Sequence, residues 1–454
     1  MPFQSTNPTT GEVLATYPSL DAAGIERVLA TAHDAYGQWR ATSFADRALL
    51  MTRAAELIES EVPVIAEMMT SEMGKTFAAA KGEVAKCAMT MRYYAEHAEA
   101  MLAPEVVKSS GSAAGIRFDP IGAVLAIMPW NFPLWQAVRF AAPTLMAGNV
   151  GILKHAPNVP ACAEFLGTLF RRAGFPEGVF QNAFIEVEDI EGVLADRRIA
   201  AVTLTGSERA GRSVAESAGR QLKKCVLELG GSDPFIIGES AVMDDVIPFA
   251  VTARIQNNGQ SCIAAKRFIV VASRAEEFTS RFAAAMSEAV VGNPMEAPTV
   301  VGPLVSAAQR EVLTAQVNDA LQQGARALCG GAPLEGPGFF YPPTVLVDVP
   351  PTSRAGSEEL FGPVAVVRVV ANLDEAIAVA NETPWGLGGS IWSSDQREVD
   401  AALAGIEAGM VFANAVVAST PELPFGGVKN SGFGRELSSY GIKEFVNVKA
   451  YYQS

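Results

Sequence analysis

The sequence predicts an α/β protein with two domains, each built on a largely parallel sheet. Short apolar runs alternate with amphipathic stretches along most of the 454 residues, which is typical of βαβ units. A chain of this length also exceeds what one hydrophobic core usually supports. The predicted strands are apolar throughout, so we expect both faces of each sheet to be covered.

The predicted elements follow one another in a regular order. Residues 21–40 and 45–69 are expected to be helical, because apolar side chains recur there at steps of three and four residues. A first sheet is then predicted, with strands at 123–128, 150–154, 179–184, 201–205 and 225–229 and helices at 160–173, 188–196 and 208–222. A second set has strands at 233–238, 268–272 and 411–416 and helices at 241–257 and 275–290. Helices between consecutive strands imply parallel crossovers.

Two further segments, 111–122 and 444–454, alternate in polarity like exposed edge strands. An exposed edge invites pairing with another chain. We therefore expect these strands to pair with another subunit and to give a homo-oligomer, a homodimer or a homotetramer.

Charge and composition exclude several classes of protein. The formal net charge of −14 is unsuited to a nucleic-acid backbone or to an anionic membrane surface. The five cysteines are scattered without a CxxC pair, and the three histidines are too dispersed to suggest a metal site. Residues 120–138 carry no charge, but several prolines interrupt them, so a strand followed by a loop is expected instead of a membrane span. With no secretory signal visible at the start, a reducing cytoplasm is the expected location.

Cys262 is the first candidate for chemistry, because it follows the polar, glycine-containing segment NNGQS at 257–261. A free thiol titrates near ~8.5, and backbone amides at a turn or helix end could increase the thiolate fraction. An inert buried cysteine remains the alternative, and it is our expectation for the other four cysteines.

Polar residues also stand where predicted strands end. Glu228 interrupts an apolar run just before Gly230 and Gly231, where burial would raise its pKa toward that of a general base. A carboxylate that reaches solvent is the alternative. Asn131 lies between two prolines after another strand, where its amide could donate to an oxyanion or simply form a turn. Gly206 opens a strand-to-helix turn suited to phosphate, although the GxGxxG fingerprint is absent.

In this order, the motifs resemble those of the aldehyde dehydrogenase superfamily. They are PWNFP around Asn131, ILKHAP around Lys154, LTGS at 204–207, LELGGSDP around Glu228, GQSC at 259–262, ELFGPV at 359–364 and PFGGVKNSGFGRE at 424–436. The match covers essentially the whole chain, and its wording is most similar to that of short bacterial succinate-semialdehyde dehydrogenases.

The resemblance implies a covalent mechanism. Cys262 would attack an aldehyde carbonyl, and the Asn131 amide and the Cys262 backbone N–H would hold the resulting oxyanion. Hydride transfer to a nicotinamide would leave a thioester, which a water activated by Glu228 would hydrolyse. The implied cofactor contacts are Trp130, Lys154, His155, Pro157, Gly206, Ser207, Leu229, Glu359 and Phe361; a metal is not implied.

The resemblance also implies a division of the chain. Residues 1–105 and 125–228, with 429–440 returning, would form a Rossmann-type cofactor-binding domain. Residues 229–428 would form the α/β catalytic domain, and 106–124 and 441–454 a small β oligomerisation extension.

The sequence departs from the family pattern beside Lys154. Relatives that prefer NAD often carry a glutamate three residues after this lysine, whereas this chain has Pro157. Without that carboxylate, a 2′-phosphate is no longer repelled. Lys154 and His155 could then bind the 2′-phosphate. We therefore expect NADP to be preferred, with NAD possible, and a tenfold preference for NAD would contradict this.

The resemblance implies that Arg139, Trp135 and Ser419 line the substrate pocket. Arg139 lies eight residues after Asn131, about two turns along a predicted helix, and its counterpart contacts the distal carboxylate of succinate semialdehyde. An ion pair at a subunit surface is the alternative for Arg139. A second arginine expected six residues before the cysteine is replaced by Gln256.

Other functions stay open at this stage. Another small aldehyde, such as glutarate semialdehyde or an alkanal, could be the substrate. The scaffold could also serve a structural role without turnover, act as a CoA-acylating relative, or act as a thiol hydrolase. The hydrolase would need a histidine beside Cys262, and the CoA-acylating enzyme would have less use for Glu228.

Overall fold

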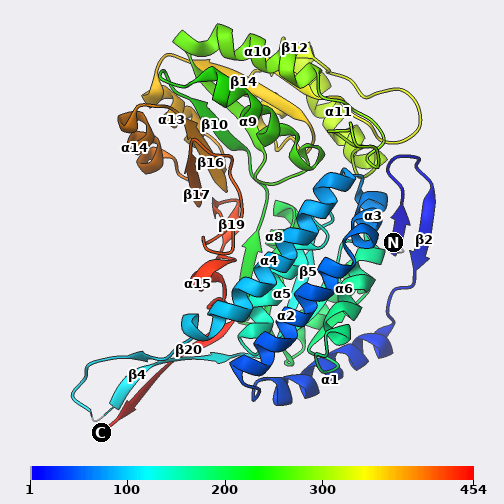
Figure 1. The fold of residues 1–454 in the computed structure, drawn as a ribbon, viewed down its shortest axis with the longest axis vertical. Helices are drawn as coiled ribbons and strands as arrows, with labels where there is room; N and C mark the ends of the chain where they lie inside the picture. The colour runs from blue at the N-terminus through cyan, green and yellow to red at the C-terminus, as the bar shows by residue number, and fades with distance from the viewer. Residues whose placement is uncertain (1–2, 112) are drawn as a thin grey trace.

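The computed structural model describes residues 3–111 and 113–454. Figure 1 shows two α/β halves stacked along the long axis, with a thin arm projecting from the lower half. The chain begins with the hairpin β1 (Phe3–Thr6) and β2 (Val13–Tyr17) and continues into four helices: α1 (Ala22–Trp39), α2 (Phe44–Ser60), α3 (Val62–Met73) and α4 (Phe77–Met101). These helices pack onto the lower half and supply many of its buried apolar side chains.

The lower half contains the first sheet, whose strand order is β19-β9-β8-β5-β6-β7. Its strands are β5 (Ala123–Met128), β6 (Val150–His155), β7 (Phe180–Asn182), β8 (Ile199–Thr205), β9 (Lys224–Glu228) and β19 (Gly432–Phe433). The helices between them are α5 (Trp135–Met146), α6 (Pro160–Arg172), α7 (Ile190–Ala195) and α8 (Glu208–Arg220), with the short turn η1 (Val187–Asp189) before α7. Strands β5 to β9 are parallel, as the sequence predicts, and only β19 returns antiparallel.

The upper half contains a second sheet in the order β12-β13-β14-β11-β10-β16-β17. Its strands are β10 (Asp233–Ile237), β11 (Ala265–Val271), β12 (Arg326–Cys329), β13 (Thr344–Val347), β14 (Val364–Val370), β16 (Gly388–Trp392) and β17 (Met410–Ala413). Its helices are α9 (Met243–Ile255), α10 (Ala275–Ser287), α11 (Ala307–Gln322), α12 (Arg354–Ser357), α13 (Leu373–Asn381) and α14 (Gln396–Gly405). The sheet is parallel except for the edge strand β12.

The arm is a separate three-stranded sheet of β20 (Val446–Gln453), β4 (Ala113–Pro120) and β3 (Glu105–Val106). Strands β4 and β20 pair antiparallel along their full length, from Val446 opposite Pro120 to Gln453 opposite Ala113. Most side chains of β20 are exposed, and the carboxyl terminus lies at the tip of the arm (Figure 1). The two predicted edge strands therefore pair with each other inside one chain.

The described part of the chain contains no helix long and apolar enough to cross a membrane. Residues 120–138 form β5, a loop and the start of α5, as expected from their prolines. All five cysteines are free. Across residues 3–111 and 113–454, no group of three or more His, Cys, Asp or Glu side chains could hold a metal.

Candidate active site

The carboxyl ends of neighbouring strands bring the predicted site residues to one edge of the first sheet. Asn131 follows β5, Gly206 and Ser207 follow β8, and Glu228 ends β9. In a parallel sheet these ends meet at the same edge, which is where open α/β sheets bind ligands. A cavity of about 270 Å³ opens there and is lined by Pro129, Trp130, Asn131, Gln136, Thr205, Gly206, Ser207, Glu228, Leu229, Gly230, Cys262, Gln309, Glu359 and Phe361.

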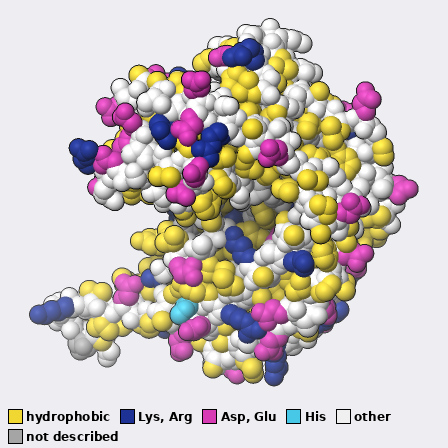
Figure 2. Space-filling model, turned by 45° about the horizontal axis from the view of Figure 1, so that its top comes forward, with side chains coloured by type: hydrophobic (Ala, Val, Ile, Leu, Met, Phe, Trp, Pro, Cys, Tyr) yellow, Lys and Arg dark blue, Asp and Glu magenta, His cyan; other side chains and the backbone are white. Residues whose placement is uncertain are grey.

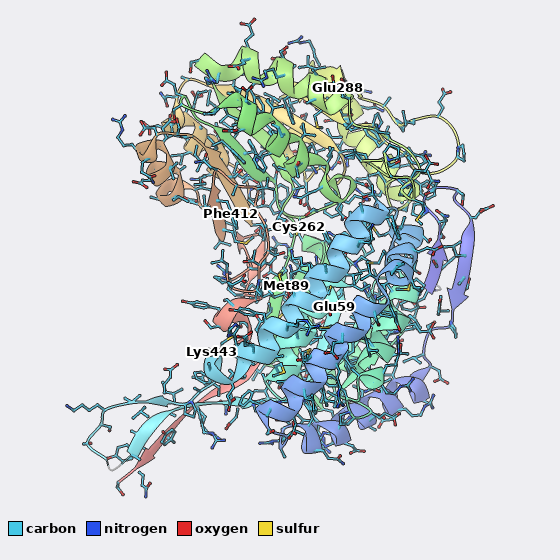
Figure 3. All side chains as sticks on the ribbon, in the orientation of Figure 1. Glu59, Met89, Cys262, Glu288, Phe412 and Lys443 are labelled. Carbon is cyan, nitrogen blue, oxygen red and sulfur yellow. The ribbon has the colours of Figure 1, made fainter. Side chains whose placement is uncertain are left out.

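Cys262 enters this cavity from the upper half of the molecule. Figure 3 shows it between the two halves, beside helix α4. Helix α9 ends at Ile255, two residues earlier than the sequence predicts, because the backbone turns left-handed at Asn257 and Asn258, with φ of 54° and 58°. Asparagine and glycine tolerate this region better than other residues. The NNG segment therefore ends the helix and turns the chain toward the cavity.

Hydrogen bonds hold this turn firmly. The Asn258 side-chain amide donates to the carbonyls of Gly74 (2.8 Å) and Pro303 (3.0 Å). Gly259 has φ of +73°, and a Cβ there would lie 2.4 Å from the carbonyl carbon of Gly362. The NNGQS segment is therefore a rigid support for the loop that carries Cys262. Its glycine stands where the backbone of Gly362 passes closest.

Asn131 is tied to the same loop. Its side-chain amide donates to the Gln260 carbonyl at 3.1 Å, and the Asn257 amide donates to the Asn131 carbonyl at 2.8 Å. Asn131 is buried and lines the cavity together with Cys262. This arrangement fixes an amide group beside the sulfur, where the sequence analysis predicts an oxyanion donor.

The Cys262 thiol has a raised pKa, to about 11. Burial is the main cause, while the positive charges of Lys266 and Arg139 act in the opposite direction. The expectation that the surroundings of Cys262 lower its pKa is therefore wrong for this structure, because desolvation outweighs the nearby cations. The thiol is held mostly protonated at neutral pH.

Glu228 is buried at the end of β9, with 2% of the residue exposed. Burial raises its pKa well above the usual range, Glu436 raises it further, and Arg139 and Arg435 lower it. The raised pKa predicted from the sequence is confirmed, and the alternative of a solvent-exposed carboxylate is wrong. A Cβ at Gly426 would lie 2.7 Å from a Glu228 carboxylate oxygen, so this glycine gives the side chain its room.

Six of the predicted cofactor residues line the rest of the cavity: Trp130, Gly206, Ser207, Leu229, Glu359 and Phe361. Ser207 caps helix α8 by accepting a hydrogen bond from the Ala210 amide at 3.3 Å. Because Gly206 and Ser207 also line the cavity, the amino terminus of this helix faces it. The rings of Trp130 and Phe361 meet edge to face, with centroids 5.6 Å apart. Glu359 pairs with Lys266 at 3.3 Å and accepts from the Gly231 amide at 3.2 Å.

Lys154 and Pro157 lie at the end of β6, away from the sulfur. Lys154 is buried, which lowers its pKa, and its ammonium lies 5.8 Å from the Phe3 ring centroid. Pro157 is exposed, and its carbonyl accepts from the Gln4 amide at 2.8 Å. The first hairpin of the chain thus borders the position where Lys154 is predicted to meet the cofactor ribose.

His155 cannot play the predicted part in binding a 2′-phosphate. It is fully buried, and its ring nitrogens bond to the Pro133 carbonyl and to the Ala156 amide, both at 2.8 Å. Burial lowers its pKa to about 4, so the ring is neutral. Successive residues of a strand point to opposite faces, and for this reason Lys154 and His155 do not act together.

The predicted substrate residues fall into two groups. Trp135 and Ser419 are brought together by Lys86 of α4, whose ammonium donates to the Ser419 hydroxyl at 2.6 Å and lies 4.2 Å from the Trp135 ring centroid. Arg139 instead forms a buried ion pair with Glu436 at 2.5 Å. The alternative for Arg139, an ion pair, is therefore observed. The pair is buried in the interior of the protein and does not lie at a subunit surface.

Sequence reasoning missed several residues. Gln136, Thr205 and Gln309 line the cavity but lie outside any motif with recognisable chemistry. Lys266 lies four residues after Cys262 and donates to the Ser261 carbonyl at 2.9 Å, a role that its spacing alone could not reveal. Lys86 stands in an amphipathic helix far from the motifs, and no neighbouring residue in the sequence distinguishes it from other helical lysines.

A larger cavity of about 740 Å³ lies elsewhere in the upper half, against β11, β13 and β14. It is lined by residues that include Arg267, Arg326 and Glu382 but no cysteine. The smaller cavity is therefore the candidate active site, because it alone of the two joins a thiol, a buried carboxyl and an amide.

The fold and the site together define an α/β protein in which a thiol, a buried carboxyl and an amide line one cavity at the carboxyl edge of a parallel sheet. The chain belongs to the aldehyde dehydrogenase family: the model of the "Aldehyde dehydrogenase family" matches residues 1–451. The predicted resemblance and fold class are thereby confirmed.

Individual relatives extend this match over the full length. The NADP(+) succinate-semialdehyde dehydrogenase 1 of Mycobacterium tuberculosis strain H37Rv is 52% identical over 452 residues, which cover 99% of each chain. The NADP(+) succinate-semialdehyde dehydrogenase of Mycobacterium avium is 51% identical over 453 residues, 99% of this chain and 96% of the relative. The crystal structure of the Streptococcus pyogenes succinic semialdehyde dehydrogenase with NADP+ has a TM-score of 0.97 and 39% identity, with 99% of both chains covered.

Proposed function

We propose that this protein oxidises succinate semialdehyde to succinate with NADP as the electron acceptor. The observation that carries the proposal is the meeting of Cys262, Glu228 and Asn131 around one cavity. The relatives that share about half of its residues over the full length carry the name of this activity.

The cavity fits a nicotinamide cofactor. The amino terminus of α8, with Gly206 and Ser207, offers free backbone amides suited to a pyrophosphate. Glu359 and the Trp130–Phe361 pair form the side nearer Cys262, where a carboxylate can accept from ribose hydroxyls and aromatic faces can flank a flat ring. Lys154 would meet the adenosine ribose. When bound, NADP accepts the hydride that leaves the substrate carbon.

The chain's own residues perform the remaining steps. The Cys262 thiol first loses its proton to solvent. The thiolate sulfur then forms a bond to the aldehyde carbon, and the carbonyl electron pair moves to oxygen, where the Asn131 amide and the Cys262 backbone N–H donate to it. After oxidation the carbon is held as a thioester. Glu228 then takes a proton from water, hydroxide adds to the thioester carbon, and the C–S bond breaks to release the acid and the thiolate.

Glu228 suits this role because it is uncharged for part of the cycle. Its raised pKa keeps a share of the carboxyl protonated near neutral pH, so the group is a stronger base once ionised than an exposed glutamate. Neither carboxylate oxygen of Glu228 has a hydrogen-bond partner among the described residues, so both can accept a hydrogen bond from a water.

NADP is proposed over NAD because Pro157 stands where a ribose-binding carboxylate would repel a 2′-phosphate. The relatives are named for NADP, and the Streptococcus pyogenes enzyme was crystallised with NADP+. Lys154 is then the cation of this region, since the ring of His155 is buried and neutral. Comparing kcat/KM for the two cofactors tests the preference, and a tenfold advantage for NAD would overturn it.

The proposed activity is tested with succinate semialdehyde, glutarate semialdehyde and butanal in the presence of NADP. We expect the highest kcat/KM for succinate semialdehyde and no turnover in a Cys262→Ala variant. Undiminished oxidation by Cys262→Ala would overturn the mechanism. Absence of turnover with every aldehyde would instead support a structural use of the scaffold.

The remaining alternatives find no support at the site. No histidine lines the cavity that contains Cys262, although a thiol hydrolase would need one. The buried Glu228 serves hydrolysis, for which a CoA-acylating enzyme has little use. We further propose a cytoplasmic location, since all five cysteines are free, and a homodimer or homotetramer joined through the β4–β20 arm.

A further inference from the structure

We propose that Lys86 of helix α4 is the cation that binds the distal carboxylate of the substrate, with the Ser419 hydroxyl as a second donor and the Trp135 ring as a wall. This inference rests on the proposed oxidation of succinate semialdehyde, whose far end is a carboxylate. It is carried by an ammonium group that is held between Trp135 and Ser419 and that has no acidic partner within the described part of the chain.

Arg139, the cation predicted from the sequence, is already neutralised. Its Nε pairs with Glu436 at 2.5 Å, and its guanidinium stacks over the Phe425 ring at 4.3 Å from the centroid. A third contact reaches the Thr205 hydroxyl at 3.4 Å. With 1% of the residue exposed, Arg139 lies within the protein interior beside Glu436.

Lys86 differs from Arg139 in this respect. No carboxylate of residues 3–111 or 113–454 forms an ion pair with it, and its only hydrogen bond there is to Ser419. An ammonium has three N–H donors, so two remain for a ligand. Lys86 is half-buried, and partial burial of a cation without an opposite charge is costly, so a bound carboxylate would lower that cost.

The nearest acidic residue on the same helix is committed elsewhere. Glu83, three residues before Lys86, pairs with the buried ammonium of Lys75. The same carboxylate accepts from the backbone amides of Leu134 (2.9 Å) and Trp135 (2.8 Å) at the start of α5. Glu83 therefore anchors α4 to α5 and leaves the charge of Lys86 uncompensated.

Lys86 is also close enough to the nucleophile for the two groups to interact electrostatically. Burial and Arg139 lower the pKa of Lys86 to about 8, while Cys87, Glu83 and Cys262 act in the opposite direction. In succinate semialdehyde the aldehyde and carboxylate carbons are separated by three single bonds, about 4 Å when extended. The proposal therefore requires the aldehyde and carboxylate ends to be bound close together, as the effect of Cys262 on the pKa of Lys86 indicates.

The position of Lys86 agrees with an approach through the groove between the two halves. Figure 2 shows this hollow, with lysine or arginine side chains among apolar ones inside it. Met89, three residues further along α4 and therefore on a similar face, is an exposed apolar side chain. The apolar walls suit the two methylenes, and the ammonium suits the charged end.

The test compares succinate semialdehyde with butanal, which has the same number of carbons and no charge. In Lys86→Met we expect KM for succinate semialdehyde to rise about thirtyfold, the loss typical of one charged hydrogen bond. KM for butanal should change less than twofold, and an unchanged Tm shows that the variant is folded. Lys86→Arg should keep most of the affinity, and Lys81→Met, an exposed lysine of the same helix, should behave as the unmodified enzyme.

A second measurement reports carboxylate binding without turnover of the semialdehyde. Succinate should inhibit butanal oxidation competitively, with an inhibition constant that rises in Lys86→Met by the same factor as KM. Equal effects on both aldehydes, or no effect on succinate inhibition, would overturn the assignment of Lys86. If the unmodified enzyme shows no preference for succinate semialdehyde over butanal, the proposed substrate fails instead, and succinate inhibition still decides the role of Lys86.

Discussion

Cys262 is half-buried and Glu228 is buried, and desolvation favours the neutral form of each. Burial raises the pKa of each, and the positive charges of Lys266, Arg139 and Arg435 only partly compensate. The raised pKa of each group limits its reactivity at rest, because the thiolate of Cys262 and the carboxylate of Glu228 are both disfavoured. Their reactivity then depends on what enters the cavity.

The raised pKa of Cys262 predicts the pH dependence of its alkylation. Below a pKa of about 11, the thiolate fraction grows tenfold with each pH unit. Labelling by iodoacetamide in the absence of cofactor should therefore become about ten times faster per unit between pH 7 and pH 10. Mass spectrometry of the peptide that contains Cys262 separates it from the other cysteines. A rate that levels off below pH 8 would contradict the raised pKa.

Arg139 is expected to act on Glu228 and not on the substrate. Its positive charge lowers the pKa of Glu228, so Arg139→Ala should raise that pKa further. The acidic limb of the kcat profile should then move to higher pH, and KM should change alike for succinate semialdehyde and butanal. An increase in KM confined to the semialdehyde would restore the substrate contact predicted from the sequence.

The turn at residues 256–259 shows how one short element positions the reaction. Helix α9 ends there, and the side chains of Asn257 and Asn258 tie the turn to Asn131 and Gly74 in the lower half and to Pro303 in the upper half. The cysteine loop is thus fixed by contacts with segments that are distant in the sequence. Its geometry depends on the assembled fold.

Gly259→Ala should disturb this turn. The added Cβ would lie 2.4 Å from the Gly362 carbonyl carbon and would require a left-handed backbone from alanine. We expect a lower Tm and a fall in kcat/KM of at least tenfold. Gly82→Ala on α4, where a Cβ meets nothing within 4 Å, is the matched control and should add about 0.5–1 kcal/mol of stability. Equal behaviour of the two variants would show that the turn is not constrained.

Periodicity predicted most elements of the two sheets, because apolar runs and helical spacing are local properties. The motifs likewise indicated Asn131, Glu228 and Cys262, since each stands at a strand end or turn. What could not be predicted depends on packing between distant segments. His155 follows Lys154 in sequence but is buried on the other face of β6, and the partner of Arg139 lies almost three hundred residues away.

At the scale of the whole molecule, the arm is the feature without a complete set of partners in one chain. Strand β20 has β4 on one side only, and its exposed side chains include Val448, Tyr451 and Tyr452. An apolar edge of this length is usually covered by another chain.

Changing both Val448 and Tyr452 to lysine should therefore weaken assembly. Analytical ultracentrifugation of the unmodified protein should show a dimer or tetramer, and the double variant should shift toward the monomer. Leu222→Lys is the control, because Leu222 is 95% exposed and lies outside the arm. An unmodified protein that sediments as a monomer would contradict the proposed assembly.

The position of the carboxyl terminus at the tip of the arm has a practical consequence for anyone who produces this protein. An affinity tag or fluorescent fusion appended after Ser454 would extend from the last residues of β20 (Figure 1). Such an addition would crowd the very surface by which subunits are expected to recognise each other. Purification handles attached to this end should therefore be cleavable and removed before the molecular mass in solution is measured.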